Sequence, residues 1–273
     1  MDANEIPVLR RKLPDLKKVY IYPLCDIHFG ESKSFDEKKF RGYLKVISDT
    51  KEAYCIFNGD LINVGLPGGV GAEDFWTQNP LTPQAQHEGI VEMVKEYDIA
   101  DKILAVVGGS NHPARVKKLC GIDYDRQFAV DMGVLDRYVE PLGALFLGIG
   151  SRAANTLTHH KGSSIWYSII VTHGTMGGKL AGSAVNSTRS LGAIYGADVV
   201  ITSHRHLDAV TKDEFYCMDY HNKCVTKIKR LYVNSGTFMK YANYAIRKGL
   251  QPNGTGTPRI RLDGLKKDVH ASV

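Results

Sequence analysis

The chain has 273 residues, of which 43% are hydrophobic and 23% are charged. These fractions are typical of globular proteins and exclude a disordered or fibrous chain. The 35 basic and 29 acidic side chains leave a formal net charge of +6, a mild excess that favours phosphate-rich partners without requiring them.

Seven short apolar, β-branched or aromatic runs have the composition of β-strands. In chain order they span residues 19–24, 54–57, 103–107, 145–149, 166–171, 199–202 and 231–233. Helical patterns lie between several of them, at residues 35–49, 82–97 and 183–195. In the first of these, Phe40 and Leu44 have the spacing of a buried helix face. His87 falls in the second helical pattern and is expected at the surface.

Alternation of strands and helices predicts an α/β protein with a largely parallel sheet. After Tyr138 the strands follow one another more closely, which favours a mixed or a second sheet. The sequence has no internal repeat, low-complexity block or clear linker. We therefore expect one domain over residues 1–273, with a basic C-terminal tail from about residue 247 that could be extended.

The cysteines are scattered and odd in number, with no Cys-x-x-Cys pair, which excludes a disulfide scaffold and a thiolate zinc cluster. Cys25 and Cys55 lie inside strand patterns and are expected to be buried. No apolar run approaches the ~20 residues of a membrane helix. Residues 1–7 lack a hydrophobic leader segment. We expect a cytoplasmic protein with no membrane partner.

Histidine, aspartate and asparagine side chains collect just past the carboxyl ends of five predicted strands. The motifs are Asp26-x-His28, Gly59-Asp60, Asn111-His112, His173-Gly174 and His204-x-His206. Strand ends of α/β sheets form the rim where ligands bind, so five such motifs are hard to explain by structure alone. Imidazole, carboxylate and carboxamide groups without thiolate suit Mn, Fe, Zn, Ni or Co better than calcium or a structural zinc.

This ordered set of motifs resembles that of the calcineurin-like metallophosphoesterases, from about residue 19 to residue 234. Residues 241–262 look like the tail of phage-encoded members. The resemblance implies an α/β fold, a β-sandwich of mixed sheets flanked by helices in four layers (αββα). It also implies a two-metal centre at the strand ends.

The resemblance further implies a role for each motif residue. Asp26, His28 and His206 would hold one metal, Asn111, His173 and His204 the second, Asp60 would bridge the two, and His112 would be a catalytic residue beside the leaving group. Two cations about 3.5–4 Å apart can lower the pKa of a shared water and bind phosphoryl oxygens. Manganese is the ion we favour for activity.

The sequence departs from the family pattern at three positions. Pro113 follows His112 where the family usually has an acid that could orient this histidine. Ser203 stands where a glycine is usual, and Asn63 where an acid is often found. None of these changes removes an implied metal ligand.

We expect a metal-dependent phosphodiesterase that acts on nucleic acid, most of all a nuclease acting on DNA. Phe75 and Trp76, beside a glycine-rich loop, could stack a base, or could instead pack the loop on the core. The alternative is the same centre acting on phosphomonoesters or small nucleotides. A third hypothesis is a binding or scaffold protein that has lost catalysis, against which the complete ligand set argues.

Overall fold

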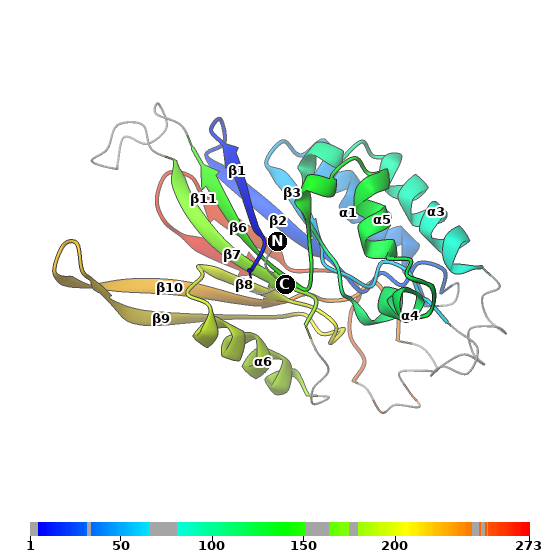
Figure 1. The fold of residues 1–273 in the computed structure, drawn as a ribbon. Helices are drawn as coiled ribbons and strands as arrows, with labels where there is room; N and C mark the ends of the chain where they lie inside the picture. Colours follow the sequence, from blue (N-terminus) through cyan, green and yellow to red (C-terminus); the bar gives the residue numbers. More distant parts are fainter. Residues whose placement is uncertain are drawn as a thin grey trace.

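The computed structural model describes residues 5–31, 34–65, 81–150, 164–174, 180–241, 246, 249 and 251–273. Two six-stranded mixed β-sheets pack face to face, with helices on their outer sides (Figure 1). The α/β sandwich of mixed sheets flanked by helices is therefore confirmed.

We call the two sheets sheet A and sheet B. In spatial order, sheet A contains β1 (Val8–Leu13), β6 (Leu142–Ile149), β7 (Ile165–Thr172), β8 (Val199–Thr202), β10 (Cys224–Asn234) and β9 (Ala209–Asp219). Sheet B contains β12 (Val269–Ser272), β11 (Arg259–Asp263), β2 (Lys18–Leu24), β3 (Ala53–Phe57), β4 (Ile103–Val107) and β5 (Tyr138–Val139). The helices are α1 (Glu37–Asp49), α3 (Pro83–Lys95), α4 (Asn111–Cys120), α5 (Tyr124–Asp131) and α6 (Ala181–Ile194), with short 3-10 turns η1 (Ala100–Lys102) and η2 (Leu135–Arg137).

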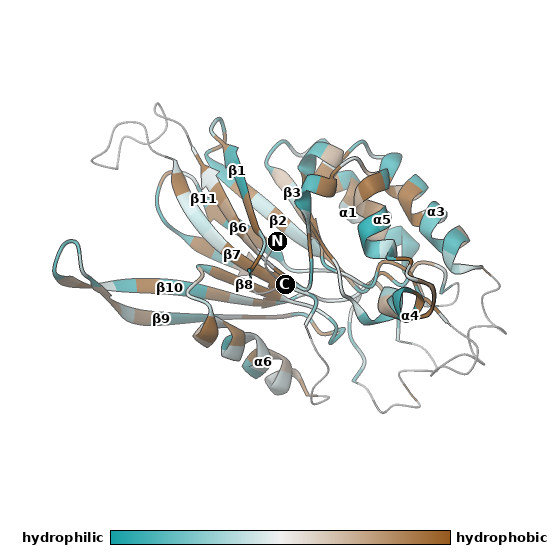
Figure 2. Ribbon diagram, viewed as in Figure 1, coloured by the Kyte–Doolittle hydropathy of each residue, from teal (hydrophilic) through white to brown (hydrophobic). Residues whose placement is uncertain are grey.

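The core has two main layers. The interior of the sandwich is filled by alternate side chains of both sheets, such as Ile21 of β2 and Leu147 of β6. A second layer lies between sheet B and its helices, where Phe40 and Leu44 of α1 are fully buried, as their spacing predicts. In Figure 2, hydrophobic residues are frequent along the central strands, while hydrophobic and hydrophilic residues alternate along the helices.

Parallel pairing brings the ends of five strands to one edge of the sandwich. In sheet B, β2, β3 and β4 run parallel to one another. In sheet A, β7 runs parallel to β8, and β8 parallel to β10. Because parallel strands end on the same side, the loops that follow β2, β3, β4, β7 and β8 meet there.

Two expectations from the sequence differ from the structure. Residues from 259 onward, in the part expected as an extended basic tail, form β11 and β12, and β11 pairs antiparallel with β2. The reason is alternation, since Ile260 and Leu262 are buried in the core while Arg259 and Arg261, which alternate with them, are more exposed. His87 is 2% exposed instead of lying at the surface, because its Nε2 bonds to Asp131 Oδ2 at 2.7 Å.

The seven predicted strands and three predicted helices are all present, with ends shifted by a few residues. Cys25 and Cys55 are buried, as expected. No helix of the described residues has the length and apolar character that crossing a membrane requires.

Candidate metal centre

The loops after the five strand ends bring every predicted ligand and His112 into one cluster. Three overlapping groups of side chains have ligand atoms within 4.8 Å of one another. The groups are Asp26 with His28 and His206, Asp26 with Asp60, His173 and His204, and His28 with Asp60 and His112. Phe75 and Trp76, the predicted substrate contacts, lie outside the described residues.

The first group is built on the loop after β2. The Nε2 atom of His206 lies 3.1 Å from Asp26 Oδ1 and 3.3 Å from His28 Nε2. His28 Nε2 is 3.8 Å from the same carboxylate oxygen. Three potential ligand atoms from two loops therefore surround one small volume.

The second group is centred on His173, after β7. Its Nε2 atom lies 3.3 Å from Asn111 Oδ1, 3.2 Å from His204 Nδ1 and 3.3 Å from Asp60 Oδ2. Its Nδ1 atom is 2.8 Å from the carbonyl oxygen of Asn58 and donates to it. That hydrogen bond directs the Nε2 atom toward the other potential ligands.

Asp26 and Asp60 each have one oxygen anchored and one oxygen without a hydrogen-bond donor. Asp26 Oδ2 accepts from the backbone N–H of His204, and Asp60 Oδ1 from that of His112, both at 3.0 Å. The remaining oxygens, Asp26 Oδ1 and Asp60 Oδ2, are buried and accept no hydrogen bond. A buried carboxylate oxygen without a partner is costly, and a bound cation would satisfy it. The residues present therefore fit a divalent metal centre.

The backbone at the site is strained at the proposed ligands themselves. Five non-glycine residues have positive φ angles, with values of 47° at Asp26, 49° at His28, 48° at Asp60, 72° at His204 and 54° at His206. Only two other described non-glycine residues, Asp98 and Lys223, share this conformation. Backbone strain of this kind is common at functional sites, where the direction of a side chain is maintained at a cost in stability. It also explains how both residues of an Asp-x-His or His-x-His pair turn toward one point.

The carboxylates and imidazoles shift one another's ionisation. Burial alone would raise the pKa of Asp26, but contact with His206 holds it well below its usual range. Burial would likewise raise the pKa of Asp60, and the neighbouring His173 and His112 lower it instead. Burial would lower the pKa of His173, yet the adjacent Asp60 raises it to about 10. Without a cation, a proton on His173 offsets part of the negative charge of the two buried carboxylates, and contact with Asp26 also raises the pKa of His206 against the effect of its burial.

His112 lies against the first group and is kept neutral. Its ring meets that of His28 edge to face, with the ring centroids 4.4 Å apart. Burial lowers the pKa of His112 well below its ordinary value, and this outweighs the attraction of Asp60. The imidazole is therefore available as a neutral hydrogen-bonding group beside the two carboxylates.

Asn58 links the two sheets beneath the site, a role the sequence analysis missed. Its Nδ2 atom donates to the carbonyl oxygen of Thr172 at 3.0 Å and also to the hydroxyl of Ser203. Ser203 stands where the motif pattern described above usually has glycine, and its hydroxyl accepts this hydrogen bond from Asn58. Asn63, at the second departure, donates through Nδ2 to Glu31 Oε2 at 3.0 Å. The side chains of Ser203 and Asn63 therefore each form a hydrogen bond near the site.

Ser110 and Asp125 support the loop that carries Asn111 and His112. Ser110 is at the N-cap position of α4 but its side chain does not cap the helix. Its hydroxyl donates instead to Asp125 Oδ2 at 2.8 Å. Asp125 is 1% exposed, and burial raises its pKa to about 7. Asp125 of α5 thus binds the loop that carries His112. In the motif pattern described above, an acid usually follows this histidine, and here Pro113 takes that position.

Comparison with family models and with curated sequences gave no match. Among solved structures, a predicted phosphoesterase from Streptococcus pneumoniae is 14% identical, with 94% of this chain and 90% of that chain covered and a TM-score of 0.34. Vacuolar Protein Sorting 29 from Cryptosporidium parvum is 14% identical, with 94% and 98% covered and a TM-score of 0.37. A metallophosphoesterase from Sphaerobacter thermophilus is 11% identical, with 90% and 84% covered and a TM-score of 0.33. At this level of similarity the function has to be inferred from the geometry of the site.

Proposed function

We propose that this protein is a metal-dependent phosphoesterase that hydrolyses phosphodiester bonds, with nucleic acid, and DNA above all, as its substrate. The observation that carries this proposal is the pair of buried carboxylates, each with one oxygen that accepts no hydrogen bond. Both face imidazoles delivered from other strand ends. A structural role would not require two buried carboxylate oxygens that accept no hydrogen bond and face imidazole nitrogens.

In this proposal the two groups of side chains hold two divalent cations. Asp26, His28 and His206 would hold one, Asn111, His173 and His204 would hold the other, and Asp60 would contribute to both. Asp26 also lies within 4.8 Å of the second group, so it is close to both positions. Oxygen and imidazole ligands without thiolate support manganese, iron, zinc, nickel or cobalt, and we favour Mn²⁺.

A pair of such cations supplies a nucleophilic water at neutral pH and neutralises the charge of a phosphoryl group. The chain's own residues would do the rest. Asp60 and Asp26 fix the spacing of the ligand groups through their backbone N–H contacts with His112 and His204. His112 donates an N–H hydrogen bond to the departing oxygen, where negative charge develops.

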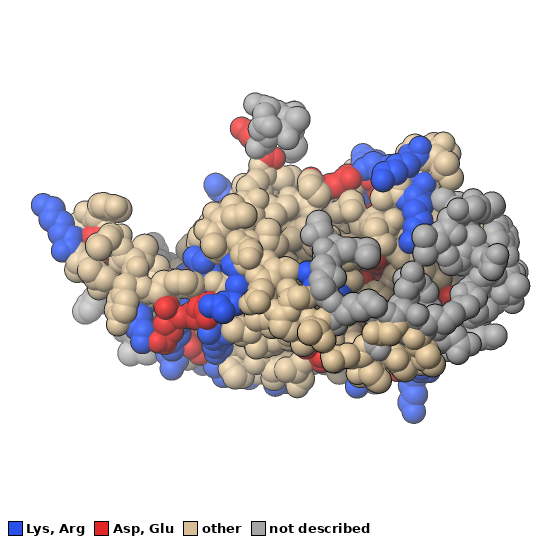
Figure 3. All heavy atoms as spheres, turned by 90° about the horizontal axis from the view of Figure 1, so that it is seen from below, with Lys and Arg blue, Asp and Glu red and all other residues tan. Residues whose placement is uncertain are grey.

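The polynucleotide substrate is supported by the net charge of +6. On the face drawn in Figure 3, the Lys and Arg side chains of the described residues form separate groups near the two ends of the molecule. Such groups are suited to contact with a phosphate backbone. Free thiols at all five cysteines support the reducing cytoplasm as the location.

The test is hydrolysis by the purified protein with Mn²⁺ added. The substrates are bis-p-nitrophenyl phosphate, p-nitrophenyl phosphate, and labelled single- and double-stranded DNA. Cleavage of DNA and of the diester supports the proposal. Good turnover of the monoester without cleavage of any polynucleotide would favour the small-molecule alternative. No hydrolysis by a protein that binds two equivalents of Mn²⁺ would favour the scaffold hypothesis.

A further inference from the structure

Arg115 lies one helical turn after His112 on α4, at the edge of the candidate metal centre. Its Nη1 atom donates to the carbonyl oxygen of Val64 at 2.7 Å. Its Nη2 atom is 3.5 Å from His112 Nε2. Residues three apart on a helix share a face, so Arg115 and His112 point to the same side of α4. The bond to Val64 holds the guanidinium in that position.

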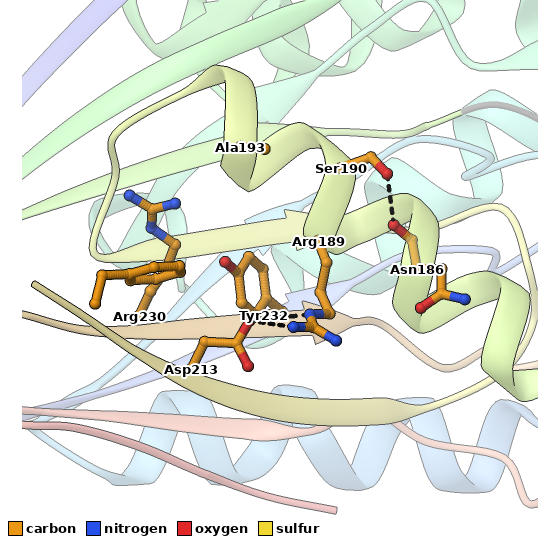
Figure 4. A pocket seen from close by; sticks show the side chains of 8 residues that line it. Asn186, Arg189, Ser190, Ala193, Asp213, Arg230 and Tyr232 are labelled. Carbon is orange, nitrogen blue, oxygen red and sulfur yellow. Dashed lines mark hydrogen bonds and ion pairs between the residues drawn. The ribbon is translucent and has the colours of Figure 1, made fainter.

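Arg115 has no acidic partner among the residues that the structure describes. Elsewhere Arg41 pairs with Glu37, and Arg261 with Asp268. The cavity of about 370 Å³ between α6 and the β9–β10 strands gives a useful contrast (Figure 4). There Arg189 bonds to Asp213, and Arg230 stacks on Phe215 and donates to backbone carbonyls.

In that cavity, Arg189 is therefore paired with a carboxylate, and Arg230 already donates hydrogen bonds to backbone carbonyls. Arg115 differs. Its guanidinium has five N–H groups but only two hydrogen-bond contacts among the described residues, with a backbone carbonyl and with a ring nitrogen. It is partly buried, which makes an unpaired positive charge costly. An anion that arrives at the centre would complete its contacts.

We infer that Arg115 binds a non-bridging oxygen of the phosphoryl group that His112 faces, which makes it a substrate-binding catalytic residue. This inference rests on the proposed function and names a further contact of the same site. Guanidinium groups match phosphate geometry and form charge-assisted hydrogen bonds with it. The N-terminus of α4, which begins at Asn111, adds a favourable partial charge on the same side.

The inference also gives a reason for the departure at Pro113. An acid after His112 would place negative charge beside the leaving group, whereas this chain places a cation within 3.5 Å of the ring. Arg115 thus places a positive charge beside His112, where Asp60 places a negative one. Such surroundings favour substrates that keep negative charge on the phosphoryl oxygens.

The experiment measures binding of inorganic phosphate to the Mn²⁺-loaded protein by isothermal titration calorimetry. The variants are Arg115→Ala, Arg115→Gln, which keeps a donor for Val64 without the charge, and Arg115→Lys. We expect phosphate to bind about 10-fold or more weakly to the first two, because a hydrogen bond between charged groups is lost. The lysine variant should recover part of the affinity. Lys118→Ala, an exposed cation on the same helix, should bind like the wild type.

Metal content, measured on each variant, should stay at the wild-type value, because Arg115 is not among the ligand groups. Wild-type phosphate affinity in Arg115→Gln, with metal content intact, would overturn the inference even if the enzyme hydrolyses phosphodiesters. Conversely, a wild-type protein that binds phosphate through Arg115 but hydrolyses no phosphoester would overturn the proposed function and leave the inference standing.

Discussion

The two sheets contribute different chemistry to the same site. Sheet B supplies both carboxylates, from the loops after β2 and β3, and its outer face is covered by α1, α3 and α5 (Figure 1). Sheet A supplies three imidazoles, from the loops after β7 and β8. Among the described helices, α6 is the one that packs on sheet A's outer side.

The carboxylates are fully enclosed, whereas the histidines of sheet A differ in burial. The side chain of Asp26 is 0% exposed, whereas that of His206, which faces it from sheet A, is 30% exposed. His173, also from sheet A, is buried beside Asp60, so His206 forms the more exposed side of the site. The difference teaches that the carboxylates of sheet B set the position of the centre, while the histidines of sheet A complete it.

The largest effect should come from sheet B. Asp60→Asn removes one of the two buried carboxylate charges at the ligand groups. We expect loss of the metal pair and a fall in activity of at least ~10³-fold, since the loss of outer-sphere partners alone already costs ~10–100-fold. Metal content by mass spectrometry and Mn²⁺ titration measure this. His206→Asn, the matched change on sheet A, should weaken Mn²⁺ binding less. Equal losses in the two variants would contradict the division of roles.

His112→Ala should separate chemistry from metal binding. This variant keeps every proposed ligand, so Mn²⁺ content should equal that of the wild type. Loss of a hydrogen-bonding group at the leaving oxygen should reduce kcat by about 10²–10⁴-fold. Steady-state kinetics on the diester, together with metal analysis, provide the test. A variant with wild-type kcat would remove His112 from the reaction.

Metal affinity should increase with pH because of His173. In the metal-free protein Asp60 raises the pKa of His173 to about 10, so the ring is protonated at pH 7. A metal binds only the neutral ring, so binding at His173 releases a proton and its affinity increases as the pH rises toward 10. One released proton corresponds to about a 10-fold gain per pH unit. Mn²⁺ titrations at pH 6.5, 7.5 and 8.5 measure the slope, and a flat profile would contradict this ionisation state.

The smallest effect should come from the support beneath α4. Asp125→Ala and Ser110→Ala should each weaken Mn²⁺ binding by about 10-fold, as expected when a partner of a ligand loop is lost. The hydroxyl and the backbone N–H of Ser110 both donate to Asp125 Oδ2, so the double variant should resemble Asp125→Ala. Additive losses would show that they act independently. Arg126→Ala, an exposed residue on the same helix, serves as the control for stability.

Much of the fold follows from local sequence patterns. The apolar runs were sufficient to predict seven strands. Helical spacing of apolar residues, as in α1, was sufficient to predict three helices. The strand β9 and the helix α4 were missed because exposed polar residues interrupt their periodicity. The pairing of β11 with β2 joins residues about 240 positions apart, and no local pattern encodes such a contact.

For the site, the motifs were enough to name the side chains that the structure brings together, since each follows a strand with a clear signal. The supporting residues Asn58, Ser110 and Asp125 were missed for a physical reason. Their roles depend on hydrogen bonds between segments distant in the sequence, such as the contact of Asn58 with Ser203. The assignment of each ligand to a particular cation stays a prediction, as does phage origin.

The positive φ angles have a consequence for how this protein can evolve. Each such residue stores ~1–3 kcal/mol that a glycine would release. A mutant library selected only for heat resistance in the presence of a chelator should therefore accumulate glycine at His28, His204 and His206, since Asp26 and Asp60 also accept backbone hydrogen bonds that glycine would lose. Selection for stability alone would therefore replace residues of the candidate metal centre, so we expect these residues to be retained only while selection also acts on function.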